Sequence, residues 1–203
     1  VRTKTVAAEA KNDGVWVTFE GENAPDGPKR YDLVLVAVGR TPNGKRIAAE
    51  RAGVSVDAKG FIPVDLQRRT NAAHIFAIGD INGQQMLAHT AMHMGVIAIE
   101  FIAGQNPYPL DVTNSPMVTF CRPEIASVGL TEKQAIEKGH NIKTGKFPMR
   151  PNGKAVIEGE TDSFTKIIGD ADTQDMLGMT IVGPHATELI GGVAMGRLLE
   201  VTT

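Results

Sequence analysis

The stretch from Thr70 to Gly95, TNAAHIFAIGDINGQQMLAHTAMHMG, constrains the fold of this chain more than any other part of the sequence. A short apolar run at His74–Ile78 predicts a strand, and Gly79-Asp80 ends it. A polar loop then leads to a helix that we expect to begin near Met86. In α/β proteins, ligand sites form where a strand ends and the next helix begins. The stretch therefore predicts a ligand site at the carboxyl end of a buried strand.

Two features of this stretch suit a ligand that carries hydroxyls and negative charge. The Asp80 carboxylate could accept hydrogen bonds from sugar-like hydroxyls, although a plain turn in which Asp80 bonds its own loop fits the same residues. The free N–H groups of the helix near Met86 would stabilise an anion, such as the N1–C2=O edge of a reduced flavin. His89 and His93 lie one helical turn apart, but no third ligand is nearby. We therefore interpret them as a polar stripe or as histidines at the edge of the core, and predict no metal site.

The sequence before this stretch is typical of β-structure. Val15–Glu20 alternates between apolar and polar residues after a turn at Asn12-Asp13-Gly14. The Val/Leu run in Tyr31–Asn43 predicts a strand buried on both faces, and the glycine that ends it favours either a strand-ending turn or the close approach of a ligand. Shorter elements are predicted next, namely a helix at Lys45–Arg51 and strands at 54–56 and 61–64.

The sequence after this stretch changes character. The helix that begins near Met86 should end at about Ala103, and the turn-rich segment Gln105–Ser115 predicts a domain boundary. Thr131-Glu132-Lys133-Gln134 has the form of a helix capping box. Strands linked by hairpins and followed by helices favour an α+β layer with an antiparallel sheet. The predicted elements are strands at 117–120, 125–129, 143–149, 164–169 and 176–182 and a final helix at 186–200.

Composition and missing motifs exclude several classes of function. The chain has 203 residues, 42% of them hydrophobic, and a net charge of −2 without a Lys/Arg tract, so we expect neither nucleic acid nor membrane as a partner. It contains no G-x-G-x-x-G, no P-loop and no recognisable catalytic set. The single cysteine, Cys121, allows no internal disulfide, and we expect it to be a small buried strand residue.

With these residues in view, the sequence resembles the pyridine nucleotide–disulfide oxidoreductase family from end to end. The T-N-x-x-x-I-F-A-I-G-D form of residues 70–80 is that family's second flavin motif, and M-L-A-H at 86–89 favours the branch that oxidises dihydrolipoamide over glutathione or mercuric reductases. The resemblance rests further on YDLVLVAVGRTPN, GFIPVDLQRRTN, PEIASVGLTEKQA, GETDSFTKIIGD and MLGMTIVGPHATELI.

The resemblance implies a fold and a set of cofactor contacts. It implies α/β, Rossmann-like nucleotide-binding domains followed by an α+β interface domain with an antiparallel sheet. Residues 1–38 would end the NAD-binding domain, 39–112 would belong to the FAD-binding and central domain, and 113–203 to the interface domain. Asp80 would bond the FAD ribityl chain, and the backbone of Met86, Leu87, Ala88 and His89 would meet the isoalloxazine ring. The NAD site would be bordered by Ala37, Val38, Gly39 and Arg40.

The resemblance also implies partners and an incomplete site. The implied enzyme is a homodimer in the cytoplasm of a bacterium, or in the mitochondrial matrix, that acts on the lipoyl domain of a 2-oxo acid dehydrogenase complex. Because the chain begins at Val1, we expect the redox-active C-x-x-x-x-C to precede it and the catalytic H-x-H-P-x-x-x-E to follow Thr203. We therefore predict no catalytic residue here. The alternatives are a non-catalytic dimerisation fragment, or another member of the family such as a glutathione- or mercuric-reductase-like enzyme.

Overall fold

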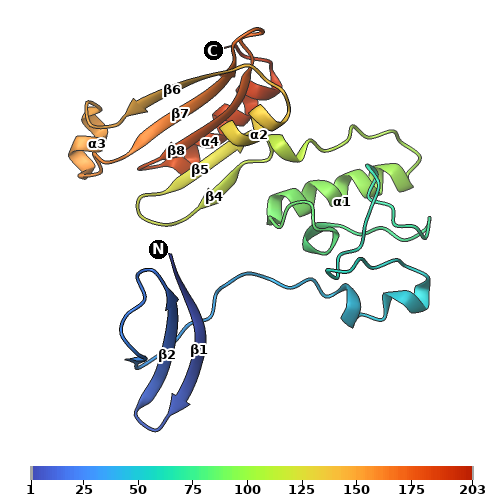
Figure 1. The fold of residues 1–203 in the computed structure, drawn as a ribbon. Helices are drawn as coiled ribbons and strands as arrows, with labels where there is room; N and C mark the ends of the chain where they lie inside the picture. The colour runs from blue at the N-terminus through green and yellow to red at the C-terminus, as the bar shows by residue number, and fades with distance from the viewer. Residues whose placement is uncertain (1, 203) are drawn as a thin grey trace. The chain divides into compact units, whose positions relative to one another are not determined.

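The computed structural model of this chain describes residues 2–202. These residues separate into two compact units, one that ends at Thr41 and one that begins at Pro42. Figure 1 shows the first unit as the blue antiparallel strands and the second as the helices and the larger sheet. The predicted ligand stretch lies wholly within the second unit.

The first unit is a three-stranded antiparallel sheet in the order β1–β2–β3. β1 (Thr3–Lys11) and β2 (Gly14–Gly21) form a hairpin, and β3 (Lys29–Tyr31) pairs with the other edge of β2. In the connecting turn, the Asp13 carboxylate accepts a hydrogen bond of 3.1 Å from the indole N–H of Trp16. The turn and the strand predicted at 15–20 are confirmed.

The apolar run after β3 is not the buried strand that its sequence predicted. Residues 33–38 have no regular secondary structure, and the side chains of Leu33, Leu35 and Val38 are 84%, 84% and 94% exposed. A strand that is buried on both faces needs a neighbouring strand and a covering layer on each face. The described residues supply neither for this run, so its composition alone does not order it into a sheet.

The segment between Pro42 and Ile78 packs around a small core without forming the elements that its sequence predicted. In place of the helix at 45–51 there are two short 3-10 turns, Gly44–Arg46 and Ala49–Ala52, because Ala48 between them has a left-handed φ of 54°. The strands predicted at 54–56, 61–64 and 74–78 do not form among the described residues, and an isolated bridge joins Arg69 to Phe76 in this segment. The apolar pattern reflects burial in a shared cluster, formed by Ala49, Val54, Ile62 and Ala77.

The helix predicted after the polar loop is α1 (Ala88–Ile102), which begins at Ala88 rather than near Met86. Its inner face is buried through Met94 and Ile97. The chain leaves the helix at Gly104, whose φ of 80° is favourable for glycine. Within residues 2–202, no helix combines the length and the apolar character needed to cross a membrane.

The C-terminal part of the second unit is a five-stranded antiparallel sheet in the order β4–β5–β8–β7–β6. All its strands were predicted, and β5 and β8 have the predicted bounds. The sheet therefore confirms the α+β architecture expected for this part of the chain. Its members are β4 (Met117–Thr119), β5 (Ile125–Gly129), β6 (Ile142–Pro148), β7 (Phe164–Asp170) and β8 (Met176–Val182).

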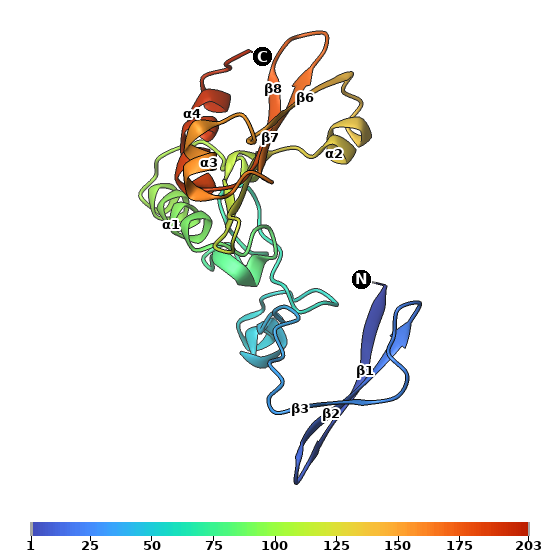
Figure 2. The same ribbon diagram turned by 90° about the vertical axis from the view of Figure 1, so that its left-hand side faces the viewer.

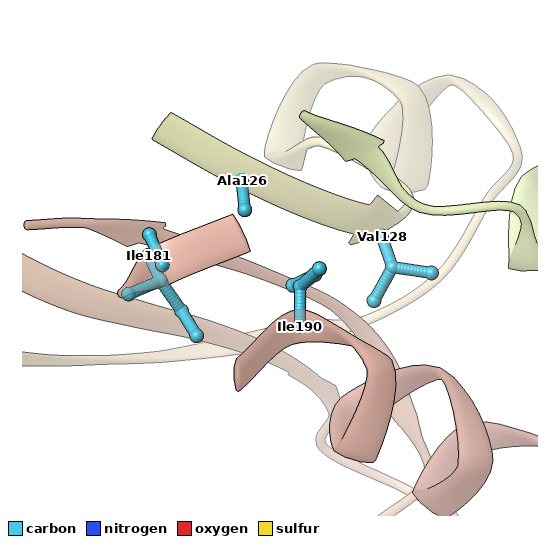
Figure 3. Close-up of a cluster of buried hydrophobic side chains, with 5 residues drawn as sticks. Ala126, Val128, Ile181 and Ile190 are labelled. Carbon is cyan, nitrogen blue, oxygen red and sulfur yellow. The ribbon is translucent and has the colours of Figure 1, made fainter. Parts of the chain in front are cut away.

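Helices lie on both faces of this sheet. α4 (Ala186–Leu198) covers one face, and α2 (Glu132–Glu137) lies on the other, as the two views in Figures 1 and 2 show. In Figure 3, Ile190 projects from α4 toward the face of the sheet and lies near Val128 of β5. This cluster anchors α4, and its other members are Ala126, Val128, Ile181 and Ala186.

Of the two short helices of this domain, one was predicted from the sequence and the other was not. α2 begins with the predicted capping box, in which the Thr131 hydroxyl accepts a hydrogen bond of 3.3 Å from the N–H of Gln134. α3 (Gly153–Glu158) was not predicted, because a glycine begins it and Pro151 lies just before it. Its cap is Asn152, whose side-chain oxygen accepts a hydrogen bond of 3.1 Å from the third residue of the helix.

Cys121 is exposed, which corrects the prediction of a small buried strand residue. β4 ends at Thr119, so Cys121 lies in the bend that follows the strand. Its Sγ is 3.0 Å from the carbonyl oxygen of Pro123. The strand is shorter than its sequence suggested, and the cysteine therefore has no place in the sheet.

Candidate functional site

Main-chain hydrogen bonds hold the residues that precede the turn of the predicted ligand stretch. The N–H of Thr70 donates to the carbonyl of Ile75 at 2.9 Å, and the N–H of Ala77 donates to the carbonyl of Arg68 at 3.0 Å. These bonds hold residues 75–77 against residues 68–70 without a continuous strand ladder. They fix the direction in which the chain enters the turn.

The turn itself is a 3-10 turn at Gly79–Asn82. Gly79 has a φ of 74°, and a Cβ atom added to it would lie 3.2 Å from the Cβ of Ala91. Both the backbone conformation and the space therefore favour glycine at this position. Asp80, the next residue, is exposed on the turn. The predicted Gly-Asp stop is therefore a turn that presents a carboxylate to solvent.

Buried polar contacts attach this turn to α1. The sulfur of Met94 accepts hydrogen bonds from the N–H of Gly79 at 3.4 Å and from the side-chain amide of Asn82 at 3.2 Å. The same amide donates to the carbonyl of Ala77 at 3.2 Å. Sequence reasoning missed this arrangement, because an I-N-G sequence signals only a turn and carries no sign of a distant methionine.

The start of α1 is open to a ligand. Leu87 is its N-cap residue with an extended backbone, and its side chain caps none of the free N–H groups. The first turn contains no acidic residue. An α-helix leaves its first N–H groups without acceptors in the helix and carries partial positive charge there. Because Ala88 and His89 are also exposed, these donors suit an anionic or carbonyl oxygen of a ligand.

The two histidines of α1 do not form a metal site. His89 Nε2 lies 3.0 Å from the carbonyl oxygen of Pro116, so this ring connects the start of α1 to the segment that enters the sheet. His93 is exposed on the same helix. Over residues 2–202, no group of three or more His, Cys, Asp or Glu side chains could hold a metal ion.

The residues predicted for the two cofactors fall in different units. Ala37, Val38, Gly39 and Arg40 belong to the first unit, where they are exposed and without regular secondary structure. Gly39 has a φ of 131°, and no atom lies within 4 Å of the Cβ position that it lacks. Asp80 and Met86–His89 both belong to the second unit, where the intervening residues 81–85 connect them. The assignment of both groups to cofactors stays a prediction, as does the division into three domains.

Two models of one family match this chain. The dimerisation domain of the pyridine nucleotide-disulphide oxidoreductases matches residues 115–203, and the model described as pyridine nucleotide-disulphide oxidoreductase matches residues 1–95. Among curated relatives, dihydrolipoyl dehydrogenase of Vibrio cholerae is 47% identical over 96% of this chain and 41% of its own length. That of Haemophilus influenzae is 49% identical over 96% of this chain and 40% of its own length. The chain thus spans about two fifths of these relatives.

Solved structures agree with the sequence comparison. LpdA of Mycobacterium tuberculosis has a TM-score of 0.86 at 28% identity, over 98% of this chain and 43% of that one. The HOCl-induced flavoprotein disulfide reductase RclA of Escherichia coli has a TM-score of 0.81 at 29% identity, over 94% of this chain and 43% of that one. The predicted resemblance and fold class are confirmed. This chain belongs to the pyridine nucleotide-disulphide oxidoreductase family.

Proposed function

We propose that this chain supplies half of the flavin site and the dimerisation domain of an FAD-dependent dihydrolipoyl dehydrogenase, which oxidises dihydrolipoyl groups and reduces NAD. One observation carries the proposal, namely that the Asp80 turn is fixed to an α1 helix whose start has no side-chain cap. Curated relatives that are 42% to 49% identical and named dihydrolipoyl dehydrogenase support the same activity.

The residues of this turn fit the chemistry of FAD. The Asp80 carboxylate would accept hydrogen bonds from ribityl hydroxyls, since an exposed carboxylate offers several lone pairs. The main chain of Met86, Leu87, Ala88 and His89 would donate N–H groups to the pyrimidine oxygen of the ring, where the helix start favours negative charge. The bound flavin would relay electrons between a dithiol and NAD. This chain would therefore contribute binding and orientation, and no acid, base or nucleophile.

The first unit would contribute to the second cofactor site. Ala37, Val38, Gly39 and Arg40 would border NAD, and their exposure among the described residues supports access by a ligand. The open space at the missing Cβ of Gly39 would let a cofactor approach the main chain. The guanidinium of Arg40 would suit a phosphate or ribose oxygen of that cofactor.

The C-terminal domain, residues 113–203, would form a homodimer. The match of residues 115–203 to a dimerisation domain supports this, and so do the exposed apolar side chains of Met195 and Leu198 on α4. Residues three apart are neighbours on a helix surface, and adjoining exposed apolar side chains are typical of an interaction surface. The further partner would be the lipoyl domain of a 2-oxo acid dehydrogenase complex. The location would be the cytoplasm of a bacterium, as the bacterial relatives suggest.

A chimera tests the proposed function. This chain would replace the matching segment of the Vibrio cholerae dihydrolipoyl dehydrogenase, which is 47% identical to it. We expect a yellow, dimeric protein that oxidises dihydrolipoamide with NAD. A folded dimer without flavin absorbance would contradict the flavin assignment, and it would leave the rival function, a non-catalytic dimerisation module, in its place.

A second candidate substrate follows from the structural comparison. The likeness to a flavoprotein disulfide reductase at a TM-score of 0.81 supports a reductase that acts on another disulfide, such as the glutathione- or mercuric-reductase-like alternative. The same chimera separates the two. With a reduced nicotinamide cofactor as the electron donor, faster reduction of glutathione disulfide than of lipoamide would favour the second candidate.

A further inference from the structure

Arg68 is buried in a way that its sequence context does not explain. Arg68 is 1% exposed, and its side chain is the largest of those that are fully buried among the described residues. Its backbone has a left-handed φ of 72°, which is unfavourable for a residue with a side chain. Burial lowers the pKa of its guanidinium, and the nearby charge of Asp65 opposes that shift. The fold therefore tolerates both an unfavourable conformation and a desolvated cation at this position.

Only part of the hydrogen-bonding capacity of the Arg68 side chain is used. Its Nη1 donates to the side-chain oxygen of Gln84, while its Nε has no acceptor within residues 2–202. A buried donor without a partner opposes folding, and a buried cation often contributes less stability than an apolar residue of similar size. A methionine would fill the same space without either cost. Core filling alone is therefore a poor explanation for an arginine here.

Gln84 lies at the middle of the loop that joins Asp80 to the start of α1. Its N–H donates to the side-chain oxygen of Asn82 at 3.2 Å, on the side of the turn. On the other side, the side-chain oxygen of Gln85 accepts a hydrogen bond of 2.8 Å from the hydroxyl of Thr90 in α1. Arg68 contacts the loop at Gln84, between these two hydrogen bonds. Its bond to Gln84 joins the loop to residues that also hold the entry into the turn, through the Arg68 carbonyl and Ala77.

We propose that Arg68 is a positioning residue for the cofactor site, which holds the loop 79–86 through Gln84 so that Asp80 and the start of α1 contact the same flavin. This inference rests on the proposed function. It assigns Arg68 no contact with the flavin. Its role is to keep the two groups that bind the flavin at a fixed separation.

Amide hydrogen exchange on this 203-residue chain tests the proposal without a cofactor. Arg68→Met should speed the exchange of the Gly83–Met86 amides by about tenfold or more, because it removes the charge-assisted hydrogen bond that holds the loop. The global unfolding temperature should stay the same or rise, because a desolvated cation has been removed. The matched control is Arg69→Met, which removes the neighbouring ion pair of 2.7 Å with Asp65 and should leave loop exchange unchanged.

A second variant protects the test against misfolding of the first. Gln84→Leu removes the acceptor and leaves the arginine, and it should loosen the same amides. If Gln84→Leu leaves their exchange unchanged, or if the faster exchange extends equally to β7 and β8, Arg68 does not position the loop.

Titration with FAD of the chimera described above, with and without each substitution, then separates this inference from the proposed function. A loop that is less often in its binding conformation lowers the apparent affinity in proportion, so Arg68→Met should weaken FAD binding by about tenfold and Arg69→Met should not. If the unaltered chimera binds no FAD, the flavin assignment of the proposed function fails, and the exchange data on this chain still decide whether Arg68 holds the loop. Equal FAD affinity of the unaltered chimera and its Arg68→Met variant would overturn the inference.

Discussion

The imidazole Nδ1 of His140 lies 2.8 Å from the carboxylate oxygen Oδ2 of Asp170. This contact joins the segment after α2 to the last residue of β7. The other carboxylate oxygen accepts hydrogen bonds from the N–H groups of Asp172 and Thr173 at 2.9 and 3.2 Å. His140 and these two amides hold the pKa of Asp170 below its ordinary value.

The stability of the C-terminal domain should therefore depend on pH in the acid range. A carboxyl group whose pKa is lower in the folded state stabilises the fold above its unfolded pKa, and this stabilisation is lost as pH falls through the folded value. We expect urea unfolding to become easier from about pH 4 downward. Asp170→Asn should lower the urea midpoint at neutral pH and flatten its acid dependence. An unchanged acid dependence in this variant would show that Asp170 is not the group responsible.

Two glycines with nearly the same backbone conformation should tolerate alanine very differently. Gly129 and Gly139 have φ values of 85° and 86°. A Cβ atom on Gly129 would lie 2.2 Å from the carbonyl oxygen of Leu177, whereas a Cβ atom on Gly139 would meet no atom within 4 Å. Gly139→Ala should cost about 1–2 kcal/mol of unfolding free energy. Gly129→Ala should cost more by about 1–3 kcal/mol, or prevent folding, because the β5–β8 contact must open. Chemical unfolding compares the two.

The capping box of α2 should contribute measurably to stability. Thr131→Ala removes the hydroxyl that accepts the Gln134 N–H, and we expect a loss of about 1 kcal/mol in the free energy of unfolding. Thr131→Ser keeps the hydroxyl and should restore most of it. Lys133→Ala, on the exposed side of the same helix, serves as the control. Equal unfolding midpoints for the alanine and serine variants would show that the Thr131 hydroxyl does not stabilise the helix.

Ile190 should dominate the packing of α4 on the sheet. It is 2% exposed and packs against Ile181 and Val128. Ile190→Ala should cost about 2–5 kcal/mol, and Ile190→Val about 1 kcal/mol, in unfolding free energy. Ile136→Ala, at a residue that is 60% exposed, should change it by less than about 0.5 kcal/mol. Similar losses at both positions would mean that α4 is held mainly by other contacts.

Local signals predicted the C-terminal domain well. Strands such as β5 and β8 pair with neighbours within this chain, so their alternating pattern and their observed structure agree. The capping box is likewise a contact between Thr131 and Gln134, close in sequence and visible as a motif. α3 escaped prediction because Gly153 weakens its helical signal and its apolar residues Val156 and Ile157 are exposed rather than patterned toward a core.

The wrong predictions concern structure that depends on contacts between residues far apart in the sequence. The run at 33–38 has the composition of a central strand, but a strand is a property of a sheet, and the described residues give this run no partner. In the candidate site, the Gly-Asp turn and the helix were predictable from residue order. The contacts that fix them were not, because Asn82 with Met94 and Arg68 with Gln84 are tertiary pairs without a local signature.

The flavin assignment of Asp80 can be tested by one measurement, the dissociation constant of FAD in the chimera with and without Asp80→Ala. The alanine removes a charged acceptor for ribityl hydroxyls, so we expect the constant to rise by about tenfold to a hundredfold. Unfolding of the C-terminal sheet should be unchanged, and Asp26→Ala, at another exposed carboxylate, should leave FAD binding unchanged. An unaltered dissociation constant, or an equal loss of flavin affinity and of sheet stability, would contradict the assignment of Asp80 to the flavin.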